Sequence, residues 1–540
     1  MKNIITQEIK KALIKLDYYH QDVDIYITVP KNKEFGDLST NIAFLLSKKI
    51  NKSSLKIAED IQKNLKSIDI FKNINIAGTG FINFKINPNS IVNYLNDIIK
   101  LNNNYGKNES NHKKVLIEFV SANPTGPLTV GHGRGAILGD TLSNIFEWNG
   151  YEVEREYYYN NAGRQMRILG NSVKARYLDL IGEKWEFPED GYQGDYIHEI
   201  AKQLLEIHGH SLKEKNEIFK EFSEKFIFDN IRNTLKNIGI IFDSFFNENT
   251  LYENKDIYKI IDALDKKGLI YKKDDAVWFR GTKVGRENDR VLIKKTGEPT
   301  YRLPDMAYHI DKMKRGYDLC IDIFGADHMD AYPDVLEVVH QLGFDKSNIK
   351  VLIHQFISVL KNGKQVKMST RKATYITLDD LIEQVSPDVV RYFFIMRSMN
   401  SHLDFDLNLA SDQSDSNPVF YLQYAYARIC NIIKHGENNS LNLKQKYDPA
   451  ILCHTDELKL LKHIVTFPEL VETTSKTLEP QNIATYLQEL AALFHRFYGQ
   501  CRVISDNSKL SKARLNLVSA VKITLENGLK ILGISAPEKM

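Results

Sequence analysis

The sequence predicts a doubly wound α/β domain with insertions at the centre of the chain, a smaller α/β domain before it, and an all-α helical bundle after it. Three short apolar runs, at 115–120, 321–328 and 351–360, alternate with helical patterns, as parallel strands covered by helices do. A glycine-rich turn follows the first run directly, and a helical pattern follows the turn. From about Asn417 to the C-terminus the apolar spacing is helical almost throughout.

The 540 residues are too many for one hydrophobic core and suit roughly three to five domains. In the first domain, apolar residues recur at helical spacing from Ile4 to Leu16, a helix is expected to begin near Asp37 or Ser39, and FINFKI (81–86) alternates like a strand. The predicted divisions are an N-terminal domain at 1–110, a central domain at 113–385 with a helical insertion at about 165–285, a connecting segment at 386–416, and a helical domain at 417–540.

The composition is that of a folded protein, with 43% hydrophobic and 26% charged residues, which excludes wholesale disorder. The net charge is only +3, so a polyanionic partner would have to bind local basic patches. The four cysteines are scattered, without a CxxC pair, so we expect neither disulfides nor structural zinc, and a cytoplasmic location. We expect no signal peptide and, because no apolar run reaches about 18 residues, no membrane span.

The segment SANPTGPLTVGHGRGAILGD (121–140) lies between an apolar strand and a helix. Such a junction presents free backbone N–H groups and the positive end of a helix dipole at the carboxyl edge of the sheet, which suits phosphate binding. Gly131, Gly133 and Gly135 would leave room for a nucleotide close to the backbone. Neither the P-loop pattern nor the dinucleotide GxGxxG spacing is present, and a glycine-rich turn with a packing role only is the alternative.

This segment resembles the HIGH signature of class I aminoacyl-tRNA synthetases. Together with REYYYNNAGRQM (155–166), it resembles the arginyl-tRNA synthetases of bacterial type in particular. The resemblance implies a Rossmann-type catalytic domain whose HIGH region binds ATP through Ala122, Asn123, Pro124, Thr125, Gly126, Pro127, Leu128, Thr129, Val130, Gly131 and His132.

One position departs from the family pattern. The family usually has His-x-Gly-His where this chain has Thr129-Val130-Gly131-His132, and the first histidine of the family helps to hold the ATP phosphates. A threonine hydroxyl can donate one hydrogen bond but carries no charge. We therefore expect a weaker hold on the phosphates at Thr129.

A basic segment, KNGKQVKMSTRKATYITLDDLI (361–382), follows the third apolar run, and a solvated charge run is the ordinary alternative for it. Its core resembles the KMSKS signature, the partner of HIGH in the same superfamily. The resemblance implies a loop that closes on ATP and neutralises the charge that builds up on the phosphates, formed by Lys367, Met368, Ser369, Thr370 and Arg371.

Thr370 stands where the signature has its second lysine. Other arginyl enzymes that lack this lysine carry one just before HIGH, where this chain has Gly126. Arg371 or Lys372 is the candidate substitute.

A specific site for arginine needs carboxylates, because the guanidinium is planar, always charged and rich in donors. Tyr301 and Asp305 lie four residues apart and would share one face of a helix, and Pro304 between them predicts a first-turn position. This YxxxD pattern resembles the arginine-recognition pair of the family. The resemblance implies that Tyr301 frames the guanidinium and that Asp305 pairs with it.

The same resemblance implies two further parts of the site. Asn123 would hold the α-amino or carboxylate end of arginine, and Gly325, Asp327 and His328 of the GADH segment would border the adenosine and arginine sites. The adjacent aspartate and histidine could also suggest a metal ligand pair, but no third ligand is placed by spacing, so we expect no metal site.

In the helical domain, Tyr421, Tyr424 and Arg428 recur on one helix face. Periodicity alone favours an aromatic core stripe, whereas the functional alternative is a platform on which anticodon bases stack. The domain resembles the anticodon-binding bundle of arginyl enzymes, including its ending LGISAPEKM, which implies that Met540 approaches the anticodon loop. VPKNKEFGDLSTNIAF (29–44) resembles the additional N-terminal domain of the family, which contacts the outer corner of the tRNA.

The resemblance implies an arginine–tRNA ligase that uses ATP with Mg²⁺, needs bound tRNA(Arg) to form the adenylate, acylates the terminal 2′-hydroxyl and acts as a monomer. Two alternatives remain. A small-molecule nucleotidyltransferase would lack both terminal domains, and a non-catalytic RNA-binding paralogue is left open by Thr129 and Thr370. A lysyl or cysteinyl ligase is disfavoured by the YxxxD context and the missing zinc ligands.

Overall fold

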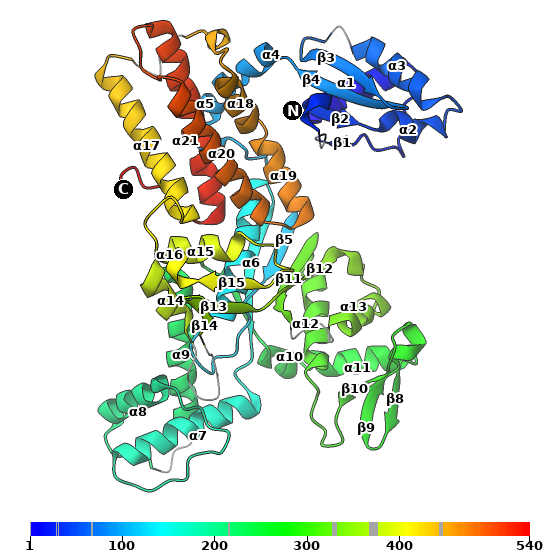
Figure 1. The fold of residues 1–540 in the computed structure, drawn as a ribbon. Helices are drawn as coiled ribbons and strands as arrows, with labels where there is room; N and C mark the ends of the chain where they lie inside the picture. The colour runs from blue at the N-terminus through cyan, green and yellow to red at the C-terminus, as the bar shows by residue number, and fades with distance from the viewer. Residues whose placement is uncertain are drawn as a thin grey trace.

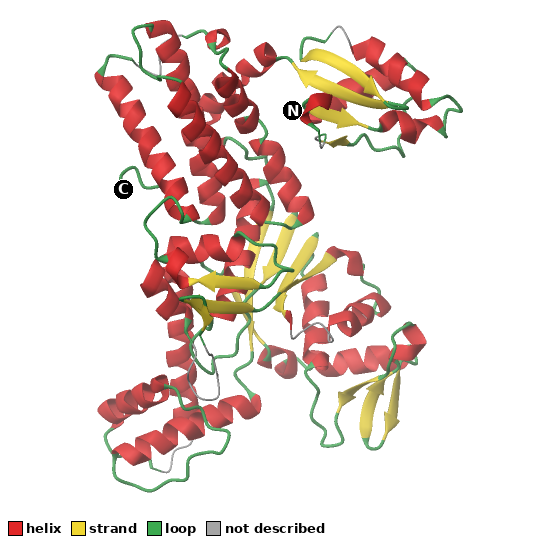
Figure 2. Ribbon diagram, viewed as in Figure 1, coloured by secondary structure: helices red, strands yellow, loops and turns green. Residues whose placement is uncertain are grey.

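The computed structural model describes residues 2–28, 30, 32–65, 68–213, 217–326, 332–366, 376–441 and 447–540. Two predicted parts of the site, Asp327 with His328 and the loop from Lys367 to Arg371, therefore lie outside the described residues. A central α/β region carries a helical bundle on one side, with the N-terminal domain beside that bundle (Figures 1 and 2). None of the helices in the described ranges combines the length and the apolar character that crossing a bilayer requires.

The centre of the molecule is a five-stranded parallel sheet in the order β12-β11-β5-β6-β7. Its strands are β5 (Lys114–Glu118), β6 (Glu152–Tyr159), β7 (Ser244–Asn247), β11 (Leu319–Gly325) and β12 (Ile349–His354). The chain runs from β5 outward to β7 and then returns to the other side of β5, so the direction of winding switches between β5 and β11. Ligands of doubly wound sheets bind beyond the carboxyl ends of the strands at such a switch point.

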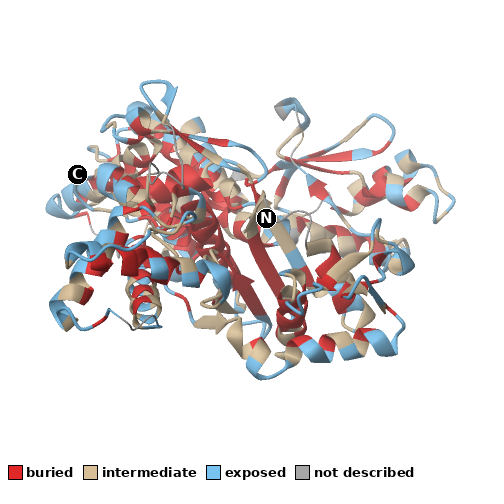
Figure 3. Ribbon diagram, turned by 90° about the horizontal axis from the view of Figure 1, so that it is seen from below, coloured by how far each residue is buried: buried red, intermediate tan, exposed pale blue. Residues whose placement is uncertain are grey.

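Helices surround this sheet and form two insertions. They are α6 (Val130–Trp148), α7 (Gly163–Leu180), α8 (Asp195–His208), α9 (Glu217–Asn237), α10 (Asn249–Glu253), α11 (Asp256–Lys266), α12 (Arg302–Lys314) and α13 (Tyr332–Gln341). A small antiparallel sheet of β8 (Ile270–Lys273), β9 (Ala276–Phe279) and β10 (Arg290–Ile293) precedes α12. Buried residues concentrate in the central strands and in the helix faces turned toward them (Figure 3).

The helix predicted after the glycine-rich turn is confirmed as α6, and FINFKI is confirmed as a strand. Helix α6 packs tightly against the residue that follows β5. A Cβ on Gly139 would lie 2.2 Å from the ring of Phe119, so only glycine fits at this position. The prediction of one strand over 351–360 is wrong. The chain turns at Gln355 and Phe356, and the second half enters a different sheet.

That second sheet contains β13 (Ile357–Lys361), β14 (Lys364–Gln365) and β15 (Leu403–Asp406), with α14 (Leu378–Val385), α15 (Pro387–Ile395) and α16 (Leu407–Ala410) around it. Apolar periodicity cannot separate β12 from β13, since both are buried strands joined by a two-residue turn. Only the pairing partners distinguish them: β12 pairs with β11, and β13 pairs with β15.

The N-terminal domain is an antiparallel sheet with helices. It comprises α1 (Lys2–Lys15), β1 (Ile27–Thr28), β2 (Leu38–Thr40), α2 (Ile42–Ser47), α3 (Ser54–Leu65), β3 (Phe71–Ala77) and β4 (Phe81–Ile86), and α4 (Pro88–Val92) and α5 (Tyr94–Leu101) follow it. The helix start predicted near Asp37 or Ser39 is wrong, because residues 38–40 are a strand and α2 begins at Ile42. Asp37 instead accepts hydrogen bonds from the backbone of Ile86 at 2.8 Å and from Lys462 at 2.7 Å.

The C-terminal bundle contains α17 (Pro418–Asn438), α18 (Thr455–Ile464), α19 (Phe467–Thr477), α20 (Gln481–Gln500) and α21 (Ser508–Leu532). A buried arginine of α15, Arg391, joins this bundle to the central domain. Its guanidinium donates to the carbonyl of Leu532 at 2.8 Å, to the carbonyl of Ile238 at 2.9 Å and to the carboxylate of Asp140 at 2.5 Å. The C-terminal helix, the helical insertion and α6 therefore meet at one side chain.

Candidate active site at the sheet switch point

The loop that leaves β5 begins with an unusual backbone. Val120 and Ser121 both adopt positive φ angles, of 67° and 45°, which side chains other than glycine rarely adopt. Two hydrogen bonds hold this turn: the Ser121 hydroxyl donates to Glu118 at 2.8 Å and accepts from the backbone N–H of Tyr158 at 3.2 Å. The end of β5 and the neighbouring strand β6 therefore determine how the chain enters the glycine-rich segment.

Thr129 occupies the N-cap position of α6 and contacts the signature histidine. Its backbone N–H donates to Nδ1 of His132 at 3.2 Å, so the ring proton of the neutral histidine lies on Nε2. Gly131 is exposed, and a Cβ there would meet only the Thr129 hydroxyl at 3.6 Å. The backbone is open at this position, as predicted.

Gly133 and Gly135 have a different role from the predicted one. A Cβ on Gly133 would lie 2.7 Å from the side chain of Leu378, and one on Gly135 would lie 3.1 Å from Nε2 of His354. These two glycines let α6 approach α14 and the end of β12 closely. Only the first of the three glycines thus faces open space.

The structure places the downstream flank of the basic segment against the glycine-rich turn. Thr377 forms a β-bridge with Thr129, and the backbone N–H of Leu378 donates to the carbonyl of Leu128 at 2.8 Å. On the upstream side, the backbone N–H of Val366 donates to the carbonyl of Val359 in the middle of β13 at 2.8 Å. The downstream flank of the basic segment, although more than two hundred residues away in the sequence, therefore lies against the glycine-rich turn at Thr129.

Asn123 and Gly126 lie in the loop between β5 and α6. The Asn123 side chain is exposed, donates to Gln165 at 3.1 Å and accepts from the backbone of Asn160 at 3.1 Å. A Cβ on Gly126 would lie 3.0 Å from the hydroxyl of Tyr196 on α8. A lysine at position 126 would therefore need Tyr196 to move.

Helix α12 begins at Arg302, so Pro304 lies in its first turn, as predicted. Since α12 leads into the start of β11, this first turn lies toward the carboxyl edge of the sheet. Tyr301 immediately precedes the helix with 62% of its surface exposed, and the Asp305 backbone donates to its carbonyl at 3.4 Å. The predicted pair therefore shares one turn of chain.

The Asp305 carboxylate has no hydrogen bond or ion pair with any residue in the described ranges. Burial raises the pKa of Asp305 to about 7; Glu118 and Glu248 also raise it, and His309 and Lys312 oppose them. An unpaired carboxyl in such a place favours a cationic ligand, because a cation would stabilise its charged form.

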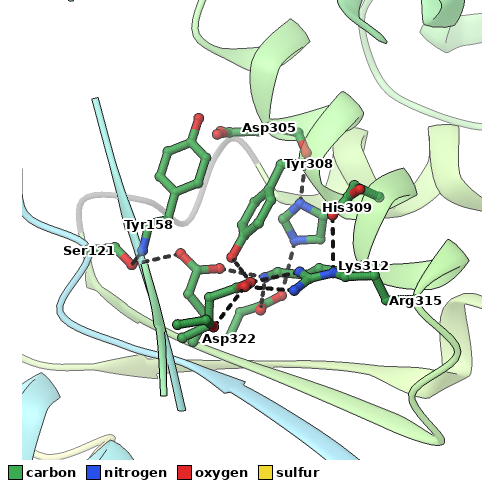
Figure 4. Close-up of polar contacts among 12 residues, drawn as sticks. Ser121, Tyr158, Asp305, Tyr308, His309, Lys312, Arg315 and Asp322 are labelled. Atoms are coloured by element: carbon green, nitrogen blue, oxygen red, sulfur yellow. Dashed lines mark hydrogen bonds and ion pairs between the residues drawn. The ribbon is translucent and has the colours of Figure 1, made fainter. Parts of the chain in front are cut away.

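Directly beneath Asp305, a buried ionic cluster links α12 to both strands at the switch point (Figure 4). The Lys312 ammonium lies 2.5 Å from a carboxylate oxygen of Glu118 on β5 and 2.5 Å from one of Asp322 on β11. His309 contacts Asp322 through Nε2 at 3.0 Å and the carbonyl of Asp305 through Nδ1 at 2.8 Å. The carbonyl of Asp305 and the carboxylate of Asp322 can only accept hydrogen bonds, so both ring nitrogens of His309 must carry a proton. His309 is therefore an imidazolium.

The pKa directions of His309 and Asp322 agree with this charge assignment, whereas burial outweighs Lys312 and raises the pKa of Glu118. Burial and Lys312 each act to lower the pKa of His309, but the opposing effect of Asp322 is larger. The pKa of His309 is therefore raised above its usual value. Burial would raise the pKa of Asp322, but Lys312 and His309 outweigh it and hold that pKa below its usual value. Two cations thus balance Glu118 and Asp322, and Asp305 is left as the unmatched anion.

The sequence reading missed Glu118, His309, Lys312 and Asp322. The available signal was an acidic residue inside each of two apolar runs, VLIEFV and IDIFGADH. A carboxylate in a buried strand requires a charged or hydrogen-bonding partner, and that requirement predicts a cation on a covering helix.

In the bundle, Tyr424, Arg428, Tyr498 and Met540 line a hollow of about 1280 Å³. The Arg428 guanidinium lies over the rings of Tyr424, at 4.6 Å, and Tyr498, at 5.6 Å. Tyr421 does not line the hollow; its ring packs on His495 at 5.0 Å. The structure therefore brings three of the four predicted RNA-contacting residues together.

Comparisons with known proteins agree along the whole chain. Three family descriptions match in order: "Arginyl tRNA synthetase N terminal domain" at 3–86, "tRNA synthetases class I (R), catalytic domain" at 94–391 and "DALR anticodon binding domain" at 422–540. An arginine–tRNA ligase of Desulfotalea psychrophila is 47% identical over 520 residues, covering 95% of this chain and 94% of that protein. One of Salinibacter ruber is 42% identical over the full length of both.

Among solved structures, the arginyl-tRNA synthetase of Thermus thermophilus superposes with a TM-score of 0.80 over the full length of both chains at 20% identity, which shows a shared fold. The sequence relatives and the family descriptions matched in order show the family as well as the fold. The chain belongs to the class I arginyl-tRNA synthetases.

Proposed function

We propose that this chain is an arginine–tRNA ligase, which activates arginine with ATP and transfers it to the 2′-hydroxyl of the terminal adenosine of tRNA(Arg). The observation that carries this proposal is the partly buried Asp305 carboxylate, which has no counter-ion among the described residues at the carboxyl edge of a doubly wound sheet. The neutralised cluster beneath it leaves Asp305 as the anion available to a guanidinium.

The chemistry requires positioning more than proton transfer. The arginine carboxylate attacks the α-phosphate of ATP in line and pyrophosphate leaves; the 2′-hydroxyl then attacks the activated carbonyl and AMP leaves. Thr129 and His132 would hold the phosphates at the start of α6, and Lys367 and Arg371 would neutralise the developing charge. Asn123 would orient the α-amino or carboxylate end of arginine, and Tyr301 would frame its guanidinium.

The remaining roles complete the proposal. ATP would enter as its Mg²⁺ complex. The N-terminal domain, residues 1–110, would contact the outer corner of the tRNA, and the helical domain, residues 417–540, would contact its anticodon. Residues 113–385 would carry the catalysis, with a helical insertion at about 165–285 and a connecting segment at 386–416. Gly325, Asp327 and His328 would border the adenosine and arginine sites. The protein would act as a cytoplasmic monomer.

The decisive experiment measures AMP release with ATP, arginine and tRNA(Arg), together with ATP–pyrophosphate exchange with and without tRNA. We expect AMP release that depends on arginine, and exchange only when tRNA is present. Citrulline is the matched control, because it keeps the shape of arginine but carries no charge for Asp305 to pair with. Tight tRNA binding without AMP release would favour the RNA-binding paralogue, and equal exchange rates would refute the tRNA requirement.

Thr129 offers a separate prediction. Changing Thr129→His should lower the KM for ATP by about tenfold, because a hydrogen bond from a histidine to a charged phosphate contributes about 1.5 kcal/mol. The KM for arginine should stay the same. Thr129→Ser, which keeps the hydroxyl and the N-cap, serves as the control and should leave both constants unchanged. An unaltered KM for ATP in the histidine variant would contradict the idea that Thr129 weakens the phosphate grip.

A further inference from the structure

A fully buried arginine, Arg134, lies on α6 two residues after the signature histidine His132. The described ranges place no carboxylate within ion-pair distance of it, and its Nε atom has no hydrogen-bond partner among them. Burial lowers the pKa of Arg134 to about 10, so the guanidinium stays charged at neutral pH. Burying a charge without a counter-ion is costly unless hydrogen bonds to fixed dipoles offset the cost.

The guanidinium donates instead to three backbone carbonyls that belong to two separate turns. Nη1 donates to Gln355 at 2.8 Å and to Ser401 at 3.0 Å, and Nη2 donates to Ser398 at 3.0 Å. Gln355 lies in the turn between β12 and β13, whereas the two serines lie in the turn between α15 and β15. The two turns also contact each other, since the backbone N–H of Gln355 donates to the carbonyl of Met399 at 2.9 Å.

Two parallel strands begin directly after the carbonyls that Arg134 binds. Strand β13 lies against α6 and pairs with β15 in parallel (Figure 1). The paired first residues, Ile357 of β13 and Leu403 of β15, each follow a bound carbonyl by two positions. One guanidinium therefore fixes the same end of both strands relative to α6. Its donors form a rigid planar fork, so it holds both turns at one spacing, which a flexible ammonium does not.

The sheet that begins at Arg134 leads into the basic signature segment. Strand β13 pairs with β14, whose last residue, Gln365, precedes Lys367 by two positions in the sequence. The downstream flank of the segment contacts the same turn of α6, because a Cβ on Gly133 would lie 2.7 Å from the side chain of Leu378. Both flanks are thus held against one helical turn, the upstream flank through Arg134 and the downstream flank through Gly133.

We propose that Arg134 is a positioning residue for adenylate formation. It fixes the spacing between the glycine-rich turn, where the ATP phosphates would bind, and the strands that lead into the basic segment. The cations of that segment would neutralise the leaving pyrophosphate, and this charge develops only in the first step of the reaction. The second step, in which the 2′-hydroxyl displaces AMP, therefore does not require Arg134. This inference rests on the proposed function.

The test is R134K in the full-length protein, with the two steps measured separately. The first step is followed as ATP–pyrophosphate exchange in the presence of tRNA(Arg), and the second as transfer of arginine to tRNA(Arg) from chemically prepared arginyl-adenylate. Lysine keeps the charge, but its single ammonium does not reproduce the fixed directions of the guanidinium donors. The matched control is R397K, which makes the same exchange at an exposed position just before the turn that contains Ser398.

We expect R134K to lower the kcat of pyrophosphate exchange about a hundredfold, since a misplacement of about 1 Å has an effect of that size on a positioned reaction. The rate of transfer from the prepared adenylate should stay at the wild-type value. The KM for arginine should also stay the same, because Asp305 lies on α12, away from the two turns. R397K should match the wild type in both steps.

The fold of R134K is checked by its affinity for tRNA(Arg), measured by fluorescence anisotropy, which should equal that of the wild type. A second variant, R134Q, removes the charge and shortens the side chain, and it should show the same selective loss of exchange. Equal losses in both steps, or a variant that no longer folds, would make Arg134 a structural residue only and overturn the proposal. Exchange by R134K at the wild-type rate would overturn it as well.

The proposed function is tested separately by arginylation with the wild-type protein. Failure of the wild type to charge tRNA(Arg) would remove the ligase proposal. A wild type that charges tRNA(Arg), together with an R134K variant that loses both steps equally, would remove only the positioning role of Arg134.

Discussion

Replacing Asp305 with asparagine should raise the KM for arginine by a factor of about one hundred to one thousand, with a smaller change in kcat. The carboxylate has no counter-ion among the described residues, so the substrate guanidinium would be its partner. An amide keeps the shape but pairs with the cation weakly, and the desolvated guanidinium would then lack its charge partner. Steady-state aminoacylation over a wide arginine range measures both constants. D262N, an exposed acid on neighbouring α11, is the control and should behave like the wild type.

The same residue predicts a pH dependence. Burial, followed by Glu118 and Glu248, raises the pKa of Asp305 to about 7, so the arginine-free protein carries a largely protonated carboxyl below that pH. Arginine keeps its charge throughout and requires the ionised form. Its affinity should therefore fall about tenfold for each pH unit below 7 and level off above 7. D305N should show no such slope, and a flat wild-type profile between about pH 5.5 and 8 would contradict the role of Asp305.

Local patterns predicted the features that local chemistry determines. The apolar run, the glycine-rich turn and the following helix correspond to β5, its loop and α6, and Pro304 marks the first turn of α12. These features depend on residues close together in the sequence, for which backbone preferences and capping rules are strong. The positions of the two signature segments could also be read locally, because each lies next to a strand.

Long-range pairing could not be read from the same patterns. Lys312 looks like a surface lysine on an amphipathic helix until Glu118, which is 194 residues away, and Asp322 of the next strand are placed beneath it. Three arginines likewise look like solvated surface charges in the sequence. In the structure all three form ion pairs with the buried carboxylate of Asp334, and they are Arg286, Arg290 and Arg302. In both cases tertiary packing determines which cation meets the buried carboxylate, and sequence spacing does not contain that information.

The bundle shows the same limit at the level of single residues. Tyr421 and Tyr424 lie one helical turn apart, and spacing assigned them one common role. The structure separates them, because Tyr421 packs on His495 and Tyr424 lines the hollow with Arg428 and Met540. A helix face is wider than one site, so periodicity identifies the face but not the residues that a ligand would touch.

Lys312→Met should give the second large effect, a local destabilisation of about 3–5 kcal/mol around α12 and β11. The substitution keeps the volume but leaves Glu118 and Asp322 buried without their shared cation. Because a chain of several domains does not unfold in two states, the measurement is native-state hydrogen exchange of peptides that cover these two elements. The KM for arginine should rise as well, since α12 carries Asp305 in its first turn.

The pH dependence of the destabilisation in Lys312→Met distinguishes a loss of ionic interactions from a loss of packing. Without Lys312, the pKa values of both carboxyls should rise, so the folded protein would bind more protons than the unfolded chain, and the destabilisation should grow with increasing pH. Adding Glu118→Gln and Asp322→Asn to the methionine variant should restore much of the protection, because the unpaired buried charges are then gone. Lys314→Met, an exposed lysine two residues further along α12, should leave the exchange rates unchanged. Protection that stays at the wild-type level in Lys312→Met would show that the cluster does not hold α12 to the sheet.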